Sequence, residues 1–260
     1  MKNRYVALFV LLSVGAFSQP ALADDPDDGV FGAYLPWISR IEFRLATASE
    51  DVSINNLPDQ VRQVTEYNRG IPHTLPSPAK GSTMADSFGF GFSFSKLNWL
   101  EFSLDLVLHS NSYGGGRTTW NEIGFPSDDY LGYEFHGYSI DPGIKIVPYA
   151  IHTLDGFEFF QVYAKTGIQK HWFTLSSGTD AWSAFTAQNS LPIDGYSYTV
   201  GAGFAVYVVY FEYLRSVSFG GYPKTSTDRY IVGLNVSIVN LKGCLANFIG
   251  CMSYIGAPKP

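Results

Sequence analysis

Apolar and polar residues alternate with a period of two along several segments of the chain. The clearest case runs from Trp99 to His109, where every second residue from Leu100 to Leu108 is leucine or phenylalanine. The preceding segment repeats the pattern, with phenylalanine at every second position from Phe88 to Phe94 and glycine or serine between. Successive side chains of a strand point to opposite faces, whereas a helix would spread these residues around its axis. The pattern therefore predicts β-strands with one apolar and one polar face.

Eight segments carry this alternation. They cover residues 37–45, 88–95, 99–109, 140–146, 162–172, 198–206, 211–215 and 230–238. Most are close to the 9–11 residues that a tilted strand needs to cross a bilayer. The phase breaks at Leu214 and Arg215, which predicts a β-bulge there. Eight strands are expected, and ten remain an alternative because the long first connection has room for another hairpin.

The connections between these segments alternate in length. Long polar stretches are predicted at 48–85, 110–130, 174–195 and 219–228, and short turns at 96–98, 148–156 and 207–209. Short periplasmic turns and longer extracellular loops are typical of outer-membrane β-barrels. We therefore expect an all-β, antiparallel, up-and-down transmembrane β-barrel over residues 24–240.

Aromatic residues recur near the expected strand ends, where they would form girdles at the two membrane interfaces. They are Trp37, Trp99, Tyr130, Tyr133, Trp172, Tyr196, Tyr210 and Tyr230. Each of them taken singly is also explained by ordinary packing.

The polar face of the predicted strands carries charged residues of both signs. They are Arg40, Glu42, Arg44, Glu101, Asp105, Asp141, Lys145, Lys165 and Glu212. Glycine and serine fill much of the same face and leave room in a narrow lumen that side chains can fill. Because an unpaired buried charge costs several kcal/mol, we expect these groups to pair inside the barrel. The alternative is a secreted soluble barrel with this face in water, although such faces usually carry more lysine and glutamate.

Composition supports a membrane barrel. Charged residues make up 15% of the chain, against about 25% in ordinary soluble proteins. Aromatic residues make up 16%, and glycine is abundant at 26 residues. No apolar run of about 18 residues follows Ala23, so no transmembrane helix is predicted there. The net charge of −6 gives no basis for nucleic-acid binding, which needs a basic surface.

The two ends of the chain have their own signals. Lys2 and Arg4 precede a short apolar run and the small residues Ala21 and Ala23, which predicts a secretory signal peptide over residues 1–23. A retained anchor helix is the alternative, but the apolar run is short for one. We expect residues 241–260 to form a periplasmic tail, with a disulfide between Cys244 and Cys251 after export to an oxidising compartment. Two free thiols or a metal half-site are the alternatives for this pair.

Three late segments carry a resemblance to a known family. Gly201-Ala202-Gly203-Phe204, Phe211-Glu212-Tyr213-Leu214-Arg215 and Gly233-Leu234-Asn235-Val236-Ser237-Ile238 resemble the late strands and the assembly signal of small OmpA-type outer-membrane barrels. The resemblance covers about residues 30–240. It implies an eight-stranded barrel in the outer membrane of a Gram-negative bacterium, inserted by the barrel-assembly machinery. The chain departs from the family because about 20 residues follow the signal, and no long peptidoglycan-binding domain does.

His109-Ser110-Asn111 is the one candidate for catalysis. Lipid A 3-O-deacylases, which are also eight-stranded barrels, carry a comparable cluster of these residue types. Here His109 and Ser110 are adjacent and would point to opposite faces of a strand, so they match the arrangement of a nucleophile and its base poorly. His109 could share a face with Asn111, Glu101 and Asp105.

No cofactor or metal is expected. His136, His152 and His171 lack the spacing of metal ligands. The glycine run 114–116 lies in a loop and does not join a strand to a helix, as a phosphate-binding loop would.

Three functions remain after these arguments. The first, which we favour, is a monomeric structural or surface-recognition barrel with a polar, largely filled lumen. It would sit among outer-membrane lipid and lipopolysaccharide, and the stretches 48–85, 110–130 and 174–195 could bind an extracellular ligand. The second is a lipid A-modifying enzyme with His109 in its site. The third is a narrow solute pore, which the inward charges would obstruct in a lumen of eight strands.

Overall fold

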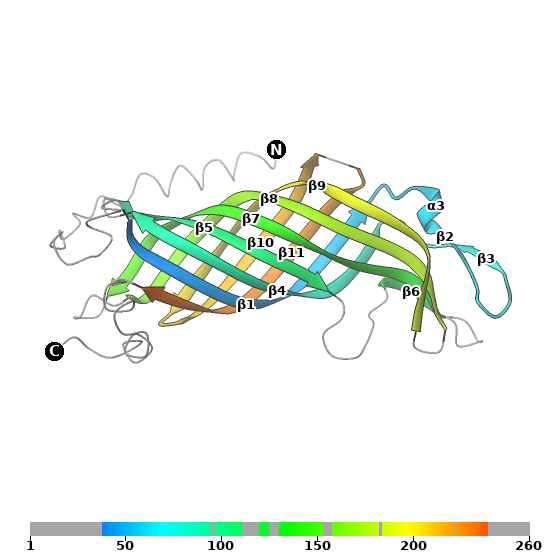
Figure 1. The fold of residues 1–260 in the computed structure, drawn as a ribbon, viewed down its shortest axis with the longest axis horizontal. Coiled ribbons are helices and arrows are strands. Elements are labelled where there is room, and N and C mark those ends of the chain that lie inside the picture. The colour runs from blue at the N-terminus through cyan, green and yellow to red at the C-terminus, as the bar shows by residue number, and fades with distance from the viewer. Residues whose placement is uncertain are drawn as a thin grey trace, which may run out of the picture.

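Eight long antiparallel strands form the body of the molecule (Figure 1). The computed structural model describes residues 38–94, 97–110, 120–124, 130–152, 158–181, 184–220 and 222–238. The eight strands are β1 (Ile38–Asn55), β4 (Ala79–Phe94), β5 (Leu97–Ser110), β7 (Tyr130–His152), β8 (Glu158–Ala181), β9 (Ala184–Val206), β10 (Val209–Gly220) and β11 (Lys224–Ile238).

The eight strands close into a ring. Each pairs with the next along the chain, β5 pairs with β7, and β1 pairs with β11 to complete the circle. The predicted all-β up-and-down barrel of eight strands is confirmed. The short strand β6 (Trp120–Gly124) pairs with β7 only, beyond the end of β5.

The connection between β1 and β4 does contain an extra hairpin, but outside the barrel wall. Residues 56–78 form helix α3 (Asp59–Arg62) and the paired strands β2 (Gln63–Thr65) and β3 (Pro72–Thr74). We call these residues the cap. Because its strands pair only with each other in the described part of the chain, the ten-stranded alternative is wrong. No helix among the described residues is long and apolar enough to cross a membrane.

The outer face of the sheet is apolar and the inner face is polar, which is the opposite of a soluble protein. On β5, Leu104, Leu106 and Leu108 are exposed, whereas Asp105 and His109 are buried. Exposed apolar side chains surround the barrel in a band that we call the lipid-facing belt. It includes Phe43, Leu45, Phe88, Phe90, Leu104, Leu106, Leu108, Ile140, Val162, Ile168, Val200, Phe204, Phe211, Val232 and Leu234.

Such a belt around a closed sheet is suited to lipid. The ring pairs the backbone of every strand on both sides, and no free edge is left within the belt. An apolar exterior around a polar interior is the pattern of outer-membrane barrels. The chain is therefore an integral β-barrel of the outer membrane of a Gram-negative cell, as its sequence predicts.

The strands are much longer than the sequence pattern indicates. Strand β8 has 24 residues and β9 has 23, where about 9–11 suffice to cross the bilayer. The long loop predicted at 174–195 is wrong, because β8 and β9 pair through most of it, out to Ala181 and Ala184. The loop predicted at 219–228 is also wrong, because β10 ends at Gly220 and β11 begins at Lys224.

The sequence pattern underestimates the strand lengths because each strand passes from lipid into water. Outside the belt polar residues lie on both faces of the strand, as Ser176 and Ser177 do on β8. The hydrophobic alternation then disappears, although the backbone pairing continues. For the same reason the predicted loop 48–85 contains the end of β1 and the start of β4. The stretch 110–130 contains β6, and its remaining residues between β5 and β7 lie outside the described part of the chain.

The predicted turn at 207–209 is confirmed, with Tyr207 and Val208 between paired Val206 and Val209. Tyr207 has a φ of 60°, an unusual value for a residue other than glycine. Its amide donates a hydrogen bond of 2.8 Å to Phe159 O, and Asn235 N donates one of 2.7 Å to Val208 O. Strands β8 and β11, which lie on either side of the β9–β10 hairpin, therefore hold the turn in place.

The bulge predicted at Leu214 and Arg215 is wrong. Strand β10 pairs without a register shift across both residues. Leu214 points inward and is buried against Ala205, Tyr210 and other small or apolar residues, whereas Arg215 points outward. The apparent break in phase reflects an apolar residue on the inner face and a charged one on the outer face.

The two ends of the barrel are distinct. The start of β1 and the end of β11 pair at one end, through Ile41 and Ile238, and the turn at 207–208 lies there too. The opposite end carries the cap (Figure 1). Short turns mark the periplasmic side, so the cap is extracellular. The predicted signal peptide 1–23, the tail 241–260 and the Cys244–Cys251 disulfide lie outside the described residues. The predicted turns at 96–98 and 148–156 are too long, because residues 97–98 belong to β5 and residues 148–152 belong to β7.

Candidate functional site

Among the residues whose side chains are described, ten charged ones are buried on the inner face of the barrel. We call them the interior charge cluster: Glu42, Arg44, Glu50, Glu101, Asp105, Asp141, Lys145, Lys165, Glu212 and Arg229. Each is at most 7% exposed. Eight of the nine charges predicted for the inner face belong to it. The side chain of the ninth, Arg40, lies outside the described part of the structure.

Asp105 lies at the centre of this cluster. Its carboxylate accepts hydrogen bonds from Arg44 Nη2, which lies 2.6 Å from each of its oxygens. It also accepts one of 2.9 Å from Lys165 Nζ, which lies 3.2 Å from Glu212 Oε1. Strands β1 and β8, which carry Arg44 and Lys165, lie on opposite sides of the ring. Asp105 therefore joins opposite walls across the lumen.

A second layer of the cluster lies nearer the periplasmic end. Lys145 Nζ is 3.8 Å from Glu42 Oε2 and 3.7 Å from Glu101 Oε2. The same ammonium lies 4.7 Å from the ring centre of Tyr163, within range of a cation–π contact. Asn235 donates a hydrogen bond of 2.9 Å to Glu42 Oε2.

A third layer lies nearer the extracellular end. Arg229 Nη2 is 2.5 Å from Asp141 Oδ2, and its Nε is 3.4 Å from Glu50 Oε1. Glu50 also contacts His109, with 2.7 Å between Oε2 and Nδ1. The other ring nitrogen of His109, Nε2, is 3.0 Å from Ser139 Oγ.

Glu50, His109 and Ser139 thus have the order of a carboxylate, an imidazole and a hydroxyl in nucleophilic catalysis. The surroundings do not suit that chemistry. Each of the three residues is at most 1% exposed. Ser139 Oγ also accepts a hydrogen bond from Gln169, and the edge of the His109 ring contacts Phe173, with 4.8 Å between ring centres. Ser139 is therefore enclosed, and its hydroxyl is engaged by both His109 and Gln169.

His109, the catalytic candidate of the sequence, therefore faces the lumen and not the lipid. It lies on the same face as Glu101 and Asp105. Among the described residues no cluster of histidine, cysteine, aspartate or glutamate could hold a metal ion. His171 is buried in the lumen and His136 is exposed on the outer face, so they do not converge.

Sequence reasoning missed Glu50, Ser139 and Arg229. Glu50 falls in a stretch predicted to be a loop, and Arg229 just precedes a predicted strand. The spacing of the residues could have revealed Glu50. It is an even number of residues from Glu42 and Arg44, so an extended β1 places all three on one face.

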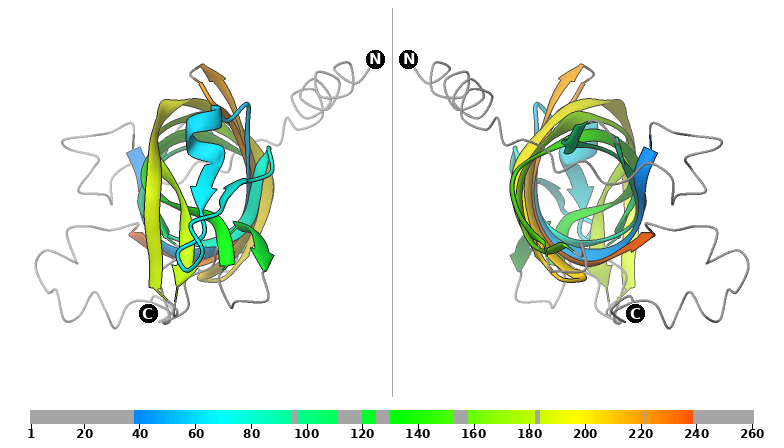
Figure 2. Two further views of the ribbon diagram at one scale, coloured as in Figure 1. Left: turned by 90° about the vertical axis from the view of Figure 1, so that its right-hand side faces the viewer. Right: turned by 90° about the vertical axis from the view of Figure 1, so that its left-hand side faces the viewer.

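The extracellular end of the lumen is covered by the cap (Figure 2, left). Apolar side chains of the cap and of the upper strands form one buried cluster, the cap core. It comprises Val52, Ile54, Leu57, Val61, Val64, Leu75, Ala79, Leu131, Tyr133, Phe135, Phe173, Leu175 and Ile193. The ring of His171 stacks on Phe173, with 4.6 Å between centres, where this apolar cluster meets the polar interior.

Polar contacts also hold the cap to the wall. Gln188 on β9 accepts a hydrogen bond from Thr65 N and donates one to Thr65 O, both of 2.6 Å. Asn189 donates one of 2.7 Å to Gln63 O. Tyr133 donates one of 3.0 Å to Pro76 O, and burial under the cap raises the pKa of Tyr133 to about 12. Beyond Tyr196 strand β9 has no partner in β10, and the cap contacts that edge.

Little space remains around the central ion pairs. The hollow lined by Arg44, Asp105, Lys165 and Glu212 has a volume of about 10 Å³. A cavity needs roughly 10–15 Å³ to hold a single water molecule, so this hollow has room for one at most.

No protein-family model matches the chain, and no curated protein matches it significantly. Solved structures resemble it, among them the three that follow. Neisserial surface protein A is 10% identical, over 75% of this chain and 96% of that one, with a TM-score of 0.41. The attachment invasion locus protein of Yersinia pestis, solved with the heparin analogue sucrose octasulfate, is 11% identical over 75% and 99%, with a TM-score of 0.39.

The N-terminal β-barrel domain of Pseudomonas aeruginosa OprF is 10% identical over 74% of this chain and 97% of that domain, with a TM-score of 0.33. At these identities the likeness concerns the fold alone, which strand pairing already establishes. Eight strands whose two chain ends meet at one end of the barrel are the architecture expected from the resemblance to small OmpA-type barrels.

Replacing Asp105 with alanine should destabilise the barrel by about 3–5 kcal/mol, because Arg44 and Lys165 stay buried after their shared carboxylate is lost. Lys145→Ala should also destabilise it, because it removes the cation between Glu42 and Glu101. The measurement is urea unfolding of the protein in phospholipid vesicles. Asp59→Ala is the control, since its exposed pair with Arg62 in the cap contributes about 0–1 kcal/mol. Unchanged midpoints for both interior variants would contradict the pairing.

Proposed function

We propose that this protein is a monomeric, non-catalytic surface barrel whose extracellular end recognises a partner outside the cell. The observation that carries the proposal is the cap core, a folded apolar unit built above the lipid-facing belt. A barrel that served only as a membrane anchor would need no strands beyond the belt and no folded loop over its mouth.

The interior supports a lumen that is filled and not used for passage. Ion pairs cross the barrel between opposite walls, as Arg44, Asp105 and Lys165 do. The hollow beside them is about 10 Å³, and the cap core lies above them. Moving a hydrated solute through would require breaking buried ion pairs, each of which is costly to leave unpaired.

The extracellular end offers a rigid platform. Strands β7, β8 and β9 extend as a paired wall past the belt, and the cap is fixed to that wall by the hydrogen bonds of Gln188 and Asn189. The loop between β2 and β3 projects from this platform (Figure 1). Tyr67 there is 64% exposed and Ile71 is 45% exposed. Exposed aromatic and apolar residues on a rigid support are typical of recognition surfaces.

The first test replaces the tip of this loop. We expect the double variant Tyr67→Ser and Ile71→Ser to lose binding of protein-bearing liposomes to a panel of immobilised extracellular-matrix proteins and glycosaminoglycans. The control is Thr186→Ser, also exposed and extracellular, near the β8–β9 hairpin. Equal binding by the double variant, the control and the wild type, on every surface that the wild type binds, would contradict recognition by this tip.

The second test addresses the enzyme alternative. Lipid A from cells that express the protein should have the same acyl-chain masses as lipid A from cells without it, because Ser139 and His109 are inaccessible. Mass spectrometry of lipid A measures this, with insertion of the barrel confirmed on an unboiled gel. A change in acyl-chain mass that disappears in His109→Ala would show that the cluster is catalytic after all.

A further inference from the structure

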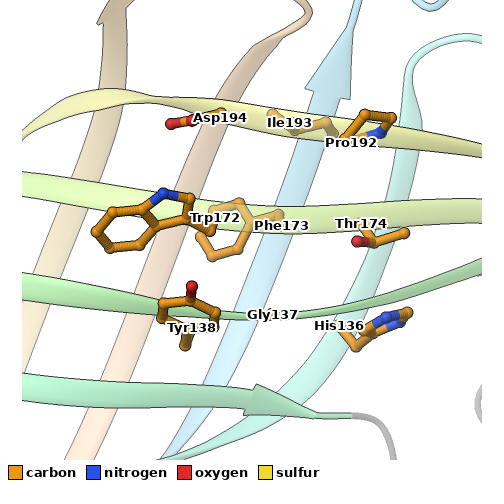
Figure 3. Close-up of a pocket in the computed structure, with 9 residues that line it drawn as sticks. All are labelled: His136, Gly137, Tyr138, Trp172, Phe173, Thr174, Pro192, Ile193 and Asp194. Carbon is orange, nitrogen blue, oxygen red and sulfur yellow. The ribbon is translucent and has the colours of Figure 1, made fainter.

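A surface hollow of about 330 Å³ lies on the outer face of the barrel wall (Figure 3). Its floor and walls follow from the register of three strands. Gly137 on β7, Phe173 on β8 and Ile193 on β9 are aligned, and their side-chain positions point inward. The backbone of this row forms the floor. The volume is at the lower end of the roughly 300–1,000 Å³ of small-molecule pockets.

Outward side chains of the neighbouring rows form the walls. Tyr138, Trp172 and Asp194 form the wall nearer the belt, and His136, Thr174 and Pro192 form the opposite wall. The rings of Tyr138 and Trp172 stack, with 5.0 Å between centres and 24° between planes. Figure 3 shows these two rings on one side of the hollow and His136 and Thr174 on the other.

The hollow lies at the extracellular border of the lipid-facing belt. The next outward row toward the periplasm is Ile140, Lys170 and Tyr196, followed by Ile168 and Tyr198. The belt therefore runs directly into the aromatic wall. An occupant that is continuous with the surrounding lipid must have apolar chains in the belt and a polar group at the height of the hollow. That is the structure of a membrane lipid with its headgroup in the site.

The lining discriminates between kinds of headgroup. Lys170 is the neighbouring cation, but it forms an ion pair with Asp194 and lies over the rings of Trp172 and Tyr196, at 5.1 and 4.5 Å from their centres. Its charge is thereby compensated, and the Asp194 carboxylate repels a phosphate. A carboxylate, an imidazole and a hydroxyl beside a flat aromatic surface suit a sugar ring, which has hydroxyls at its rim and an apolar C–H face.

We infer that this hollow binds a saccharide ring in the headgroup of an outer-leaflet glycolipid, such as lipopolysaccharide. The sugar ring packs against the edge of the stacked Tyr138 and Trp172 rings, and its hydroxyls donate to Asp194 and exchange hydrogen bonds with Thr174 and His136. The acyl chains lie along Ile140, Ile168 and the rest of the belt. The site is on the lipid side of the wall and is independent of the recognition proposed for the cap.

The test is native mass spectrometry of the barrel in phosphatidylethanolamine and phosphatidylglycerol nanodiscs that contain increasing amounts of rough lipopolysaccharide. The wild type should retain lipopolysaccharide in preference to either phospholipid. Trp172→Leu and Asp194→Asn should each weaken that retention about tenfold or more, a change of about 1.4 kcal/mol. Trp99→Leu is the matched control, because Trp99 is 49% exposed at the periplasmic end of β5.

Three results would overturn the inference. The first is equal retention by Trp172→Leu, Asp194→Asn and the Trp99→Leu control, all shown to be folded on an unboiled gel. The second is retention of phospholipid as tight as that of lipopolysaccharide by the wild type. The third is binding of soluble core oligosaccharide, without acyl chains, as tight as that of the glycolipid, which would assign the site to free saccharides. If Trp172→Leu does not fold, the nearly isosteric Asp194→Asn decides alone.

Discussion

A closed sheet in lipid has only one place for polar side chains, its lumen, and that constraint shapes the rest of this molecule. Alternate residues on every strand must face either hydrocarbon or the inside. Ten charges consequently meet within the barrel, where each needs a partner. Asp105 meets this need between Arg44 and Lys165, and in doing so joins β5 to strands on opposite walls. The same contacts that satisfy buried charges also occupy the space through which a solute would pass.

Outside the membrane the constraint changes, and the chain builds differently. Strands β7 to β9 continue as a paired wall in water, and their inner face becomes apolar where Phe135, Phe173 and Ile193 meet the cap. The interior therefore changes along the barrel axis from ion pairs, through the buried imidazoles of His109 and His171, to an apolar core. The outer face changes in the opposite sense, from the belt through the Tyr138 and Trp172 girdle to polar residues. The hollow beside Trp172 lies where the second change occurs.

How much of this the sequence predicts depends on which solvent each segment meets. Within the bilayer, lipid imposes a strict alternation, so the segments from Phe88 to His109 and the charges Arg44, Asp105 and Lys165 could be placed on the correct faces. Beyond the belt both faces of a strand become polar or mixed, so the sequence of the β8 and β9 extensions resembles that of a loop. The cap escaped prediction because its core forms only when Leu75 and Val64 meet Leu131 and Phe135, which are distant in sequence. Leu214 suggested a bulge because an apolar residue inside a barrel mimics a shift of phase.

We propose that ion pairs and the cap close the lumen, so that the protein acts through its outer surfaces. Planar-bilayer conductance of the reconstituted wild-type protein tests this most directly. A closed lumen should give no steady conductance above that of the bare bilayer. Leu75→Asp should give none either, because it disrupts the cap core but leaves the ion pairs of Asp105 in place. Sustained channels from the wild-type protein would show that the lumen is open and restore the narrow pore as its function.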